Sequence, residues 1–339
     1  MSDVVATPPA VPITTGGAQA TPSGDDGFEG GIEGSALGDR IYAGVIWLFA
    51  VCVPVLLVLI AVSIFIAGWP ALHRFGLSFL TSSSWDPVNG KFGAAPAIYG
   101  TLVSSAIALV IATPLAIGVS VFLSEFAPPW LRQPVAFFVD LLAAIPSVVY
   151  GVWGIFVLIP LLRTALIPFL RDTLHLSVIP LFSGPNYGYS MLAAGMILAI
   201  MVLPYIASVS REVLMAVPRS QREAALALGA TKWEMIRGAL LPYAKSGIIG
   251  GVILGLGRAL GETMAVTMVI GNRAEISASL FAPAYTMASL IANEFSEASG
   301  DLHLSALMAV GFVLFVITII VNAIARWLVW KVSRTGSKG

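Results

Sequence analysis

Six long apolar segments constrain the fold of this chain more than any other feature. Each is long enough to cross the roughly 30 Å hydrocarbon core of a bilayer as a helix. The segments cover residues 41–69, 98–123, 135–161, 191–214, 247–271 and 304–329. They do not alternate polar and apolar residues with a period of two, which argues against a β-barrel. Charged residues make up 11% of the chain, against about 25% in soluble domains. The sequence therefore predicts an all-α integral membrane protein with six transmembrane helices.

The distribution of basic residues predicts the orientation. With the N-terminus inside, twelve Lys and Arg residues fall on the inner side and five on the outer side. Inner loops are enriched in basic residues, so both termini are expected in the cytoplasm. Residues 1–38 hold five acidic residues, no basic ones, and much Pro, Gly, Ser and Thr. We expect a disordered cytoplasmic tail over 1–38 and a six-helix transmembrane domain over 39–339, with a cytoplasmic loop at 215–245.

One ion pair stands inside the fifth apolar segment. Arg258 and Glu262 are the only basic and acidic residues of the stretch 247–271, which is expected to form one helix. They lie one helical turn apart and can touch. A charge at the bilayer centre costs about 2.5–3.5 kcal/mol on insertion scales, so Arg258 should not face lipid.

Two hypotheses explain this pair. In the first, it is structural and fixes helix register. In the second, Arg258 lies on the path of an anion, because its planar fork can hold two phosphate oxygens. Glu262 would then neutralise the empty path and accept a hydrogen bond from a protonated phosphate oxygen. Sulfate lacks that donor, so the pair would also select phosphate.

Small residues and other polar groups add packing predictions. Gly247, Gly251 and Gly255 recur every fourth residue, which allows close approach of another helix. Kinks rather than helix ends are expected at Pro54, Pro114, Pro146 and Pro204. The histidines are scattered at segment ends and are expected at the surface; they are His73, His175 and His303.

Three polar residues of the third segment have open roles. Asp140 either pairs with a basic residue near the inner face or helps to gate a path. Ser147 and Tyr150 follow Pro146 and either offer hydroxyls to a passing anion or pack in the core.

The loop 215–245 predicts two short helices that meet at a sharp turn. Ser220 with Glu223, and Thr231 with Glu234, have capping-box spacing. Gly229 can end the first helix, expected over 221–228, in the left-handed conformation. Pro242 is expected to limit the second helix. The first helix offers small apolar residues with a basic rim, a surface suited to a groove on another protein.

The same loop resembles the EAA signature of ABC importer permeases through Glu223-Ala224-Ala225, Gly229 and Leu241-Pro242. The signature expects Ile where this chain has Ala239. In that family the loop fits a cleft in a cytoplasmic ATPase. The resemblance implies ATPase coupling through Arg222, Glu223, Ala224, Ala225, Leu226 and Gly229. The chain has no GxxxxGK[ST] motif, so it is expected to be a non-catalytic subunit without a bound cofactor or metal, with ATP and Mg on the partner ATPase.

A further resemblance narrows the family. Residues 255–266, GLGRALGETMAV, look like the fifth-helix sequence of the PstC family of bacterial phosphate importer permeases. Residues 144–151 and 285–289 are similar to that family too, and the match covers about residue 94 to the C-terminus. It implies a type I ABC importer permease (MetI-like) bundle with a cytoplasmic EAA coupling helix, whose substrate path includes Arg258, Glu262, Ser147 and Tyr150.

The implied partners are a PstA-like permease in a heterodimer, two PstB-like ATPase subunits, a PstS-like phosphate-binding protein, inorganic phosphate and membrane lipid, but no nucleic acid. The implied location is the bacterial inner (plasma) membrane, as a multi-pass protein. Three alternatives stay open: a permease for another oxyanion such as sulfate or molybdate, an intramembrane enzyme acting on lipid phosphates, and a channel or scaffold without ATP coupling.

Overall fold

The computed structural model describes residues 36–175 and 178–335, so the predicted disordered tail lies outside it except for residues 36–38. Those three residues begin helix α1 (Ala36–Phe75). The chain divides into two units, the first ending at Leu56. Within that unit, the described part is the N-terminal portion of α1, whose large apolar side chains are exposed. Exposed apolar side chains around a whole helix suit a lipid environment.

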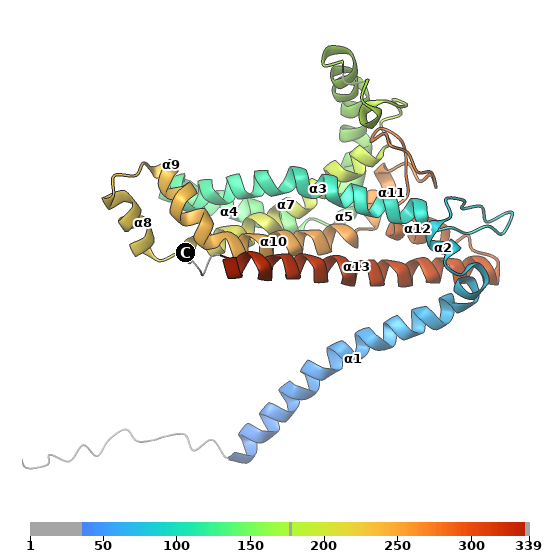
Figure 1. Cartoon of the computed structure of the whole chain (residues 1–339), viewed down its shortest axis with the longest axis horizontal. Coiled ribbons are helices and arrows are strands. Elements are labelled where there is room, and N and C mark those ends of the chain that lie inside the picture. Colours follow the sequence, from blue (N-terminus) through green and yellow to red (C-terminus); the bar gives the residue numbers. More distant parts are fainter. Residues whose placement is uncertain (1–35, 176–177, 336–339) are drawn as a thin grey trace, which may run out of the picture. The chain divides into compact units, whose positions relative to one another are not determined.

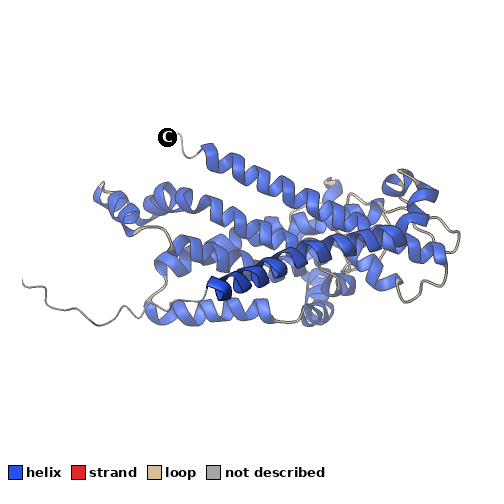
Figure 2. Cartoon of the chain, turned by 90° about the horizontal axis from the view of Figure 1, so that it is seen from below, coloured by secondary structure: helices blue, strands red, loops and turns tan. Residues whose placement is uncertain are grey.

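Six described helices are long and apolar enough to cross a membrane, which agrees with the predicted number. They are Gly38–Phe75, Ala95–Phe126, Ser147–Thr173, Met191–Met215, Lys232–Leu260 and Asp301–Lys331. Within the second unit, α3 (Ala95–Val121), α7 (Met191–Met215), α10 (Leu241–Leu260) and α13 (Asp301–Thr335) run alongside one another (Figure 1; Figure 2). The regular elements of the described residues are helical, as the six-helix prediction requires.

Helices α3 and α7 form the centre of the largest apolar core. Small buried residues on α3 (Ala108, Ala112 and Ala116) let the two helices approach closely. The Ser120 hydroxyl donates to the Ala207 carbonyl at 2.8 Å and so links α3 to α7. The last part of α1 packs closely on α13. A Cβ on Gly68 would lie only 2.8 Å from the Ala309 backbone nitrogen.

Prolines act differently in different helices. Pro114 and Pro204 stay inside α3 and α7, as predicted. Pro146 does not produce a kink but a complete break between α4 (Pro129–Ala144) and α5 (Ser147–Trp153), so that prediction was wrong. Ile145 has an extended ψ value of 129°, because a residue before a proline disfavours the helical region, and Pro146 continues the extended backbone with ψ 138°.

After α5 the chain continues as a helix in which π-helical turns alternate with α-helical turns. These are η2 (Gly154–Leu158), α6 (Ile159–Leu161), η3 (Leu162–Leu166) and η4 (Phe169–Thr173). In Figure 1 this green segment points away from the long axis of the main bundle. A 3₁₀ turn, η6 (Pro180–Phe182), precedes α7.

The two ends of the bundle differ. One end, the α8 end, carries α8 (Arg219–Ala227), α9 (Lys232–Met235) and the π-helical turns η1 (Phe122–Phe126) and η7 (Ile236–Leu240). The other, the α12 end, carries α2 (Ser78–Thr81) and α12 (Met287–Glu294) (Figure 1). Loops between these elements connect the long helices.

The fifth span starts and ends earlier than the sequence predicted. Pro242 does not limit a helix: it occupies the first turn of α10, where its missing N–H is tolerated. The Leu241 N–H donates to the Ile236 carbonyl, so the π-helical turn η7 continues directly into α10. The helix therefore runs from Lys232 to Leu260. The predicted single helix over 247–271 is wrong, because the chain breaks after α10 and resumes as α11 (Met264–Val269).

Candidate functional site

The break between α10 and α11 is the most unusual feature of the bundle. Gly261 ends α10, and α11 begins after Thr263. The Glu262 Oε1 atom accepts a hydrogen bond from the Ala265 N–H at 3.3 Å. This contact satisfies one of the free amides at the start of α11. The acidic residue predicted on a continuous helix therefore caps the second half of a broken one.

Arg258 and Glu262 form the predicted contact despite the break. The Arg258 Nη1 atom lies 2.8 Å from Glu262 Oε2. The two side chains differ in burial: Glu262 is 3% exposed and Arg258 is 38% exposed. The carboxylate is therefore enclosed by protein, whereas part of the guanidinium remains accessible. Among the described residues, Arg258 Nε and Nη2 have no hydrogen-bond partner.

The glycine repeat of α10 lies against α7, as predicted. A Cβ on Gly255 would lie 2.8 Å from Ile206 Cγ1. A Cβ on Gly247 would lie 2.5 Å from Val213 Cγ2. Gly251 faces Val209 between them. This close contact holds the helix that carries Arg258 against the central helix of the core.

Tyr150 lies near this region, but its hydroxyl is already bonded. It donates to the Leu142 carbonyl at 2.7 Å, across the break made by Pro146. Tyr205 donates to the neighbouring Ala143 carbonyl at 3.4 Å. The Leu142 carbonyl also accepts from the Ile145 N–H at 3.4 Å, so both tyrosines add side-chain donors to carbonyls in the last turn of α4. Ser147 is half-buried at the start of α5.

The break at Pro146 brings α5 against α11. A Cβ on Gly151 would lie 3.2 Å from the Ala265 Cα atom. Within the described residues, neither Ser147 nor Tyr150 is hydrogen-bonded to Arg258 or Glu262. The structure therefore places the four predicted path residues on adjoining elements, without joining the two hydroxyls to the ion pair.

Asp140 pairs with a basic residue on α7. Its Oδ2 atom lies 3.5 Å from Arg211 Nη2. Asp140 is half exposed, whereas Arg211 is mostly buried. This contact agrees with the pairing alternative, and a gating role stays a prediction.

The predicted coupling loop has the expected form, with three corrections. Gly229 has φ +84° and nothing near its would-be Cβ, so the turn needs glycine for its conformation. Thr231 and Glu234 form the predicted capping box. Ser220 and Glu223 do not, because α8 begins directly after Pro218 and Ser220 lies inside the helix. The first helix spans Arg219–Ala227 rather than 221–228, and Pro242 does not end the second, as described above.

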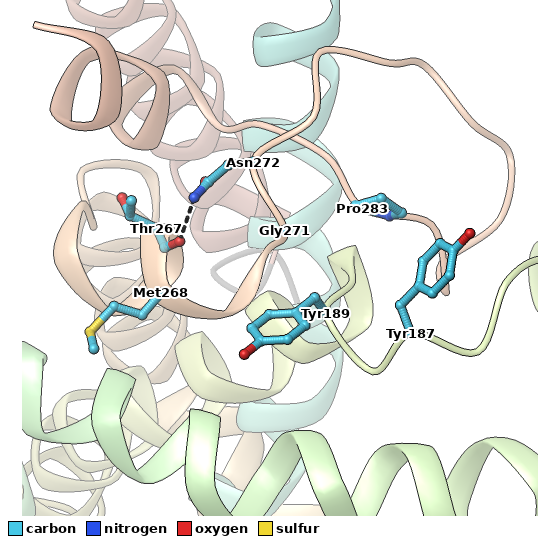
Figure 3. Close-up of a pocket in the computed structure, with 7 residues that line it drawn as sticks. All are labelled: Tyr187, Tyr189, Thr267, Met268, Gly271, Asn272 and Pro283. Carbon is cyan, nitrogen blue, oxygen red and sulfur yellow. Dashed lines mark hydrogen bonds between the residues drawn. The ribbon is translucent and has the colours of Figure 1, made fainter. Parts of the chain in front are cut away.

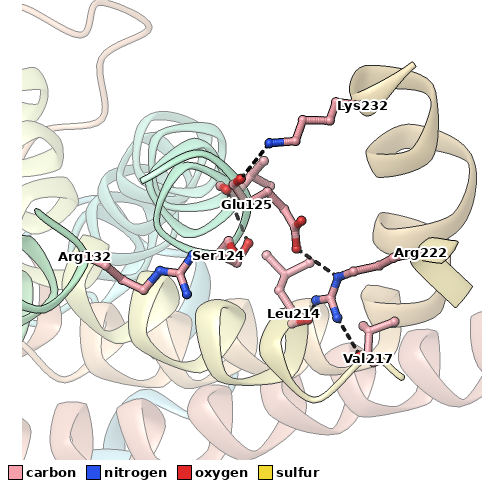
Figure 4. Close-up of polar contacts among 8 residues, drawn as sticks. Ser124, Glu125, Arg132, Leu214, Val217, Arg222 and Lys232 are labelled. Carbon is pink, nitrogen blue, oxygen red and sulfur yellow. Dashed lines mark hydrogen bonds and ion pairs between the residues drawn. The ribbon is translucent and has the colours of Figure 1, made fainter. Parts of the chain in front are cut away.

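The predicted coupling residues fall on two faces of α8. Glu223, Ala224 and Leu226 are exposed. Arg222 turns toward the bundle instead, where its Nε atom lies 3.1 Å from Glu125 Oε1 (Figure 4). Ala225 packs against the apolar cluster of the α8 end. An outward surface and an inward anchor thus share one short helix.

A small hollow opens beside the C-terminal end of α11. Figure 3 shows its lining, with Tyr187 and Tyr189 on one side and Asn272 turned toward Thr267. The Asn272 amide donates to the Thr267 carbonyl at 2.9 Å. Gly271 and Asn272 both have positive φ, a conformation these residue types favour. That Gly-Asn pair is the sequence signal for this turn, which our sequence analysis missed.

An aromatic and acidic cluster at the α12 end was also missed. His303 is mostly buried rather than at the surface: its ring stacks on Phe92 and its Nε2 atom lies 3.0 Å from Glu294 Oε2. The Trp85 indole donates to the same carboxylate oxygen at 2.7 Å. Burial raises the pKa of nearby Tyr285, so this hydroxyl stays protonated near neutral pH.

Comparisons with known proteins agree with this architecture. Residues 112–334 match the family described as binding-protein-dependent transport system inner membrane component. The chain is 52% identical over 307 residues to the phosphate transport system permease protein PstC of Mesorhizobium japonicum, covering 89% of this chain and 93% of the relative. It is 47% identical to the PstC protein of Haemophilus influenzae, covering 86% and 93%.

A solved bacterial alginate ABC transporter, in complex with an alginate pentasaccharide-bound periplasmic protein, contains a chain of similar fold. The TM-score is 0.57 at 15% identity, over 86% of this chain and 95% of that one. At this identity the likeness concerns the fold alone. The six spans and the family match place the chain in the class of type I ABC importer permeases. The chain belongs to the family of binding-protein-dependent transport system inner membrane components, and the relatives named above are its PstC members.

Proposed function

We propose that this chain is the permease subunit through which an ATP-driven importer moves inorganic phosphate into a bacterial cell. The observation that carries the proposal is its identity of 47–52% to proteins named phosphate transport system permease, over most of both chains. The chain itself is a membrane transport subunit, and in the proposal ATP and Mg bind to partner subunits rather than to this one.

The chemistry of the broken helix supports an anionic substrate. Arg258 is the accessible member of its ion pair, and two of its guanidinium nitrogens are not engaged by described residues. A planar guanidinium can bind two phosphate oxygens at once. Because Glu262 already balances its charge, the site should hold the anion weakly, as transport requires.

Glu262 supports a preference for phosphate over fully ionised oxyanions. The Arg258 and Ala265 contacts occupy its two carboxylate oxygens, one contact for each. Each oxygen has further lone-pair capacity. A phosphate that carries a proton can donate to it, whereas sulfate brings only negative charge to a buried carboxylate.

The surroundings of the site suit a larger assembly. Aromatic side chains of α4 and the segment after α5 are exposed, including Phe137, Phe138 and Phe156. In our proposal lipid and a PstA-like permease cover such faces, and the path lies between the two permeases. The excess of basic residues in the inner loops supports an orientation in the inner membrane with the α8 end and both termini on the cytoplasmic side, so in our proposal a PstS-like protein delivers phosphate at the α12 end.

Two PstB-like ATPase subunits would act on the α8 end. The exposed side chains of α8 fit a cleft in such a subunit, and ATP-dependent closure of the pair would displace α8. Since α8 follows α7 in the chain and α7 packs on α10, this displacement can reach the Arg258 helix. Alternating exposure of the site then follows from the partner's ATP cycle.

Uptake into vesicles tests this proposal. The chain is reconstituted with the companion permease, the ATPase and the binding protein, with ATP inside, and accumulation of radiolabelled phosphate, sulfate and molybdate is compared. We expect ATP-dependent accumulation of phosphate in preference to the other two. Preferential accumulation of sulfate or molybdate would refute the substrate, and phosphate entry that does not need ATP would refute the coupling.

A further inference from the structure

The π-helical turn η1 at the end of α3 collects basic side chains from three separate elements. Arg132 of α4 donates to the Ser124 carbonyl at 3.2 Å. Arg222 of α8 bonds the Glu125 carboxylate at 3.1 Å. Lys232 of α9 donates to the Glu125 carbonyl at 3.3 Å (Figure 4). One turn therefore contacts both helices of the coupling loop.

Arg222 makes the most extensive of these contacts. Besides Glu125, its Nη1 and Nη2 atoms donate to the Val217 and Leu214 carbonyls, each at 2.8 Å. The Leu214 carbonyl lies in the last turn of α7, and the Val217 carbonyl lies in the connection that follows it. A single guanidinium thus fastens α8 to the ends of both α3 and α7. A lysine could not serve three acceptors in this planar arrangement.

The pair is enclosed, unlike the rest of α8. Glu125 is 9% exposed and Arg222 is 20% exposed. Leu228, at the other end of the helix, is 90% exposed. Screening by solvent is weak for enclosed charges, so this contact is stronger than a surface ion pair. The two faces of α8 have distinct tasks: one is open to a partner and the other is fixed to the bundle.

The position of the pair explains why it is needed. Only residues 216–218 separate α7 from α8. Without another contact, a force on α8 could turn the helix about this short connection and leave the bundle in place. Glu125 lies 97 residues before Arg222 and supplies a second attachment on a different helix. Together with the packing of Ala225 on the apolar cluster of the α8 end, this attachment opposes such a rotation.

We propose that the Glu125–Arg222 pair fixes the coupling helix to α3 and α7, so that its displacement moves the bundle. Both are positioning residues: neither touches phosphate or the reacting ATP. The inference rests on the proposed coupling of this chain to an ATPase. It assigns Arg222, predicted from the sequence as part of the docking surface, to the opposite face.

A displacement of α7 reaches the Arg258–Glu262 pair through α10, which packs directly on α7. Val209 and Ile206 of α7 contact Gly251 and Gly255 of α10 too closely to admit a Cβ without movement of a side chain. A shift of α7 therefore carries α10, and with it Arg258.

The test measures phosphate uptake and ATP hydrolysis in the same vesicles that contain all subunits. Glu125→Gln removes the charge with little change in shape, and Arg222→Lys removes the planar fork. We expect both to keep ATP hydrolysis while the phosphate taken up per ATP falls at least tenfold. The matched controls are Glu212→Gln and Arg237→Gln, which change exposed residues near the same loop and should keep the wild-type ratio.

Glu125→Asp keeps the charge but shortens its reach, so its ratio should lie between those of wild type and Glu125→Gln. If the Glu125→Gln complex fails to assemble, the uptake ratio of Glu125→Asp is measured in its place. A wild-type ratio in an assembled Glu125→Gln complex, or in Glu125→Asp where Gln does not assemble, would overturn the inference. Wild-type vesicles are first tested with phosphate, sulfate and molybdate: failure of phosphate there refutes the proposed substrate alone, and the ratio is then measured with the anion that is accumulated.

Discussion

Replacing Gly255 by alanine tests the contact that holds the Arg258 helix on the core. A Cβ at this position would lie 2.8 Å from Ile206 Cγ1 and 3.0 Å from its Cδ1. Ordinary contacts between carbon atoms are about 3.5–4.0 Å. Ile206 is fully buried, so it cannot move aside without shifting its neighbours. Gly250, on the same helix, has nothing within 4 Å of its would-be Cβ and provides a matched control.

The magnitudes follow from two opposing effects. Alanine stabilises a helix interior by about 1 kcal/mol relative to glycine, and this gain applies equally at both positions. Overpacking a core costs about 1–3 kcal/mol, and it applies only at Gly255. Gly250→Ala should therefore be neutral or stabilising. Gly255→Ala should be less stable than Gly250→Ala by about 1–3 kcal/mol, since the helix gain cancels in the comparison.

The assay is thermal unfolding of the purified full-length chain in the same detergent for both variants. At about 2 °C per kcal/mol, the lower end of the usual range for larger domains, the two melting temperatures should differ by about 2–6 °C. If Gly255→Ala melts at or above the temperature of Gly250→Ala, α10 does not approach α7 as closely as described, and the route from the coupling loop to Arg258 fails with it.

Three further changes test separate parts of the account. Glu262→Gln removes a charge worth about 4 kcal/mol to a neighbour 4 Å away at an effective dielectric constant of 20, so the preference for phosphate over sulfate should fall at least tenfold in a competition uptake assay; an unchanged preference would contradict the role of the carboxylate. Tyr150→Phe loses the 2.7 Å bond to the Leu142 carbonyl and should lower stability by about 1 kcal/mol, seen as a lower melting temperature, whereas unchanged melting would mean that water replaces the hydroxyl. Thr231→Ala removes a capping box and about 1 kcal/mol of helix stability, so amide exchange at residues 232–234 should accelerate; equal protection would mean that packing alone holds α9.

Features that depend on short-range pattern could be predicted from the sequence. Six apolar segments specified the number of membrane spans, because hydropathy and length decide membrane insertion, although the third and fifth segments are each interrupted. The glycine repeat specified a close helix contact, and Gly229 specified a left-handed turn. The contact of Arg258 with Glu262 was predictable from their spacing, although the helix between them ends.

Features that depend on distant residues could not be predicted. The break after Leu260 is stabilised by the Glu262 cap on α11 and by α5, which follows the break at Pro146 and packs against α11. His303 is buried because Phe92 and Glu294 come to it from elsewhere in the chain. Arg222 turns inward because of Glu125, which belongs to a different helix. The signal for Glu125 was present: it is a lone acidic residue at the end of an apolar segment.

The exposure of Arg258 beside a buried Glu262 is the centre of this account. Substituting Arg258 alone would leave a buried carboxylate unpaired, a change that costs about 3–5 kcal/mol and could prevent assembly. The double variant Arg258→Gln/Glu262→Gln keeps the site neutral, so it separates transport from folding.

The most direct measurement is therefore ATP-driven uptake of radiolabelled phosphate by vesicles that contain equal amounts of assembled wild-type or double-variant complex. Loss of charged hydrogen bonds worth about 1.5–3 kcal/mol predicts that uptake falls at least tenfold in the double variant. Uptake at the wild-type rate would contradict the account, and would assign the Arg258–Glu262 pair to structure alone.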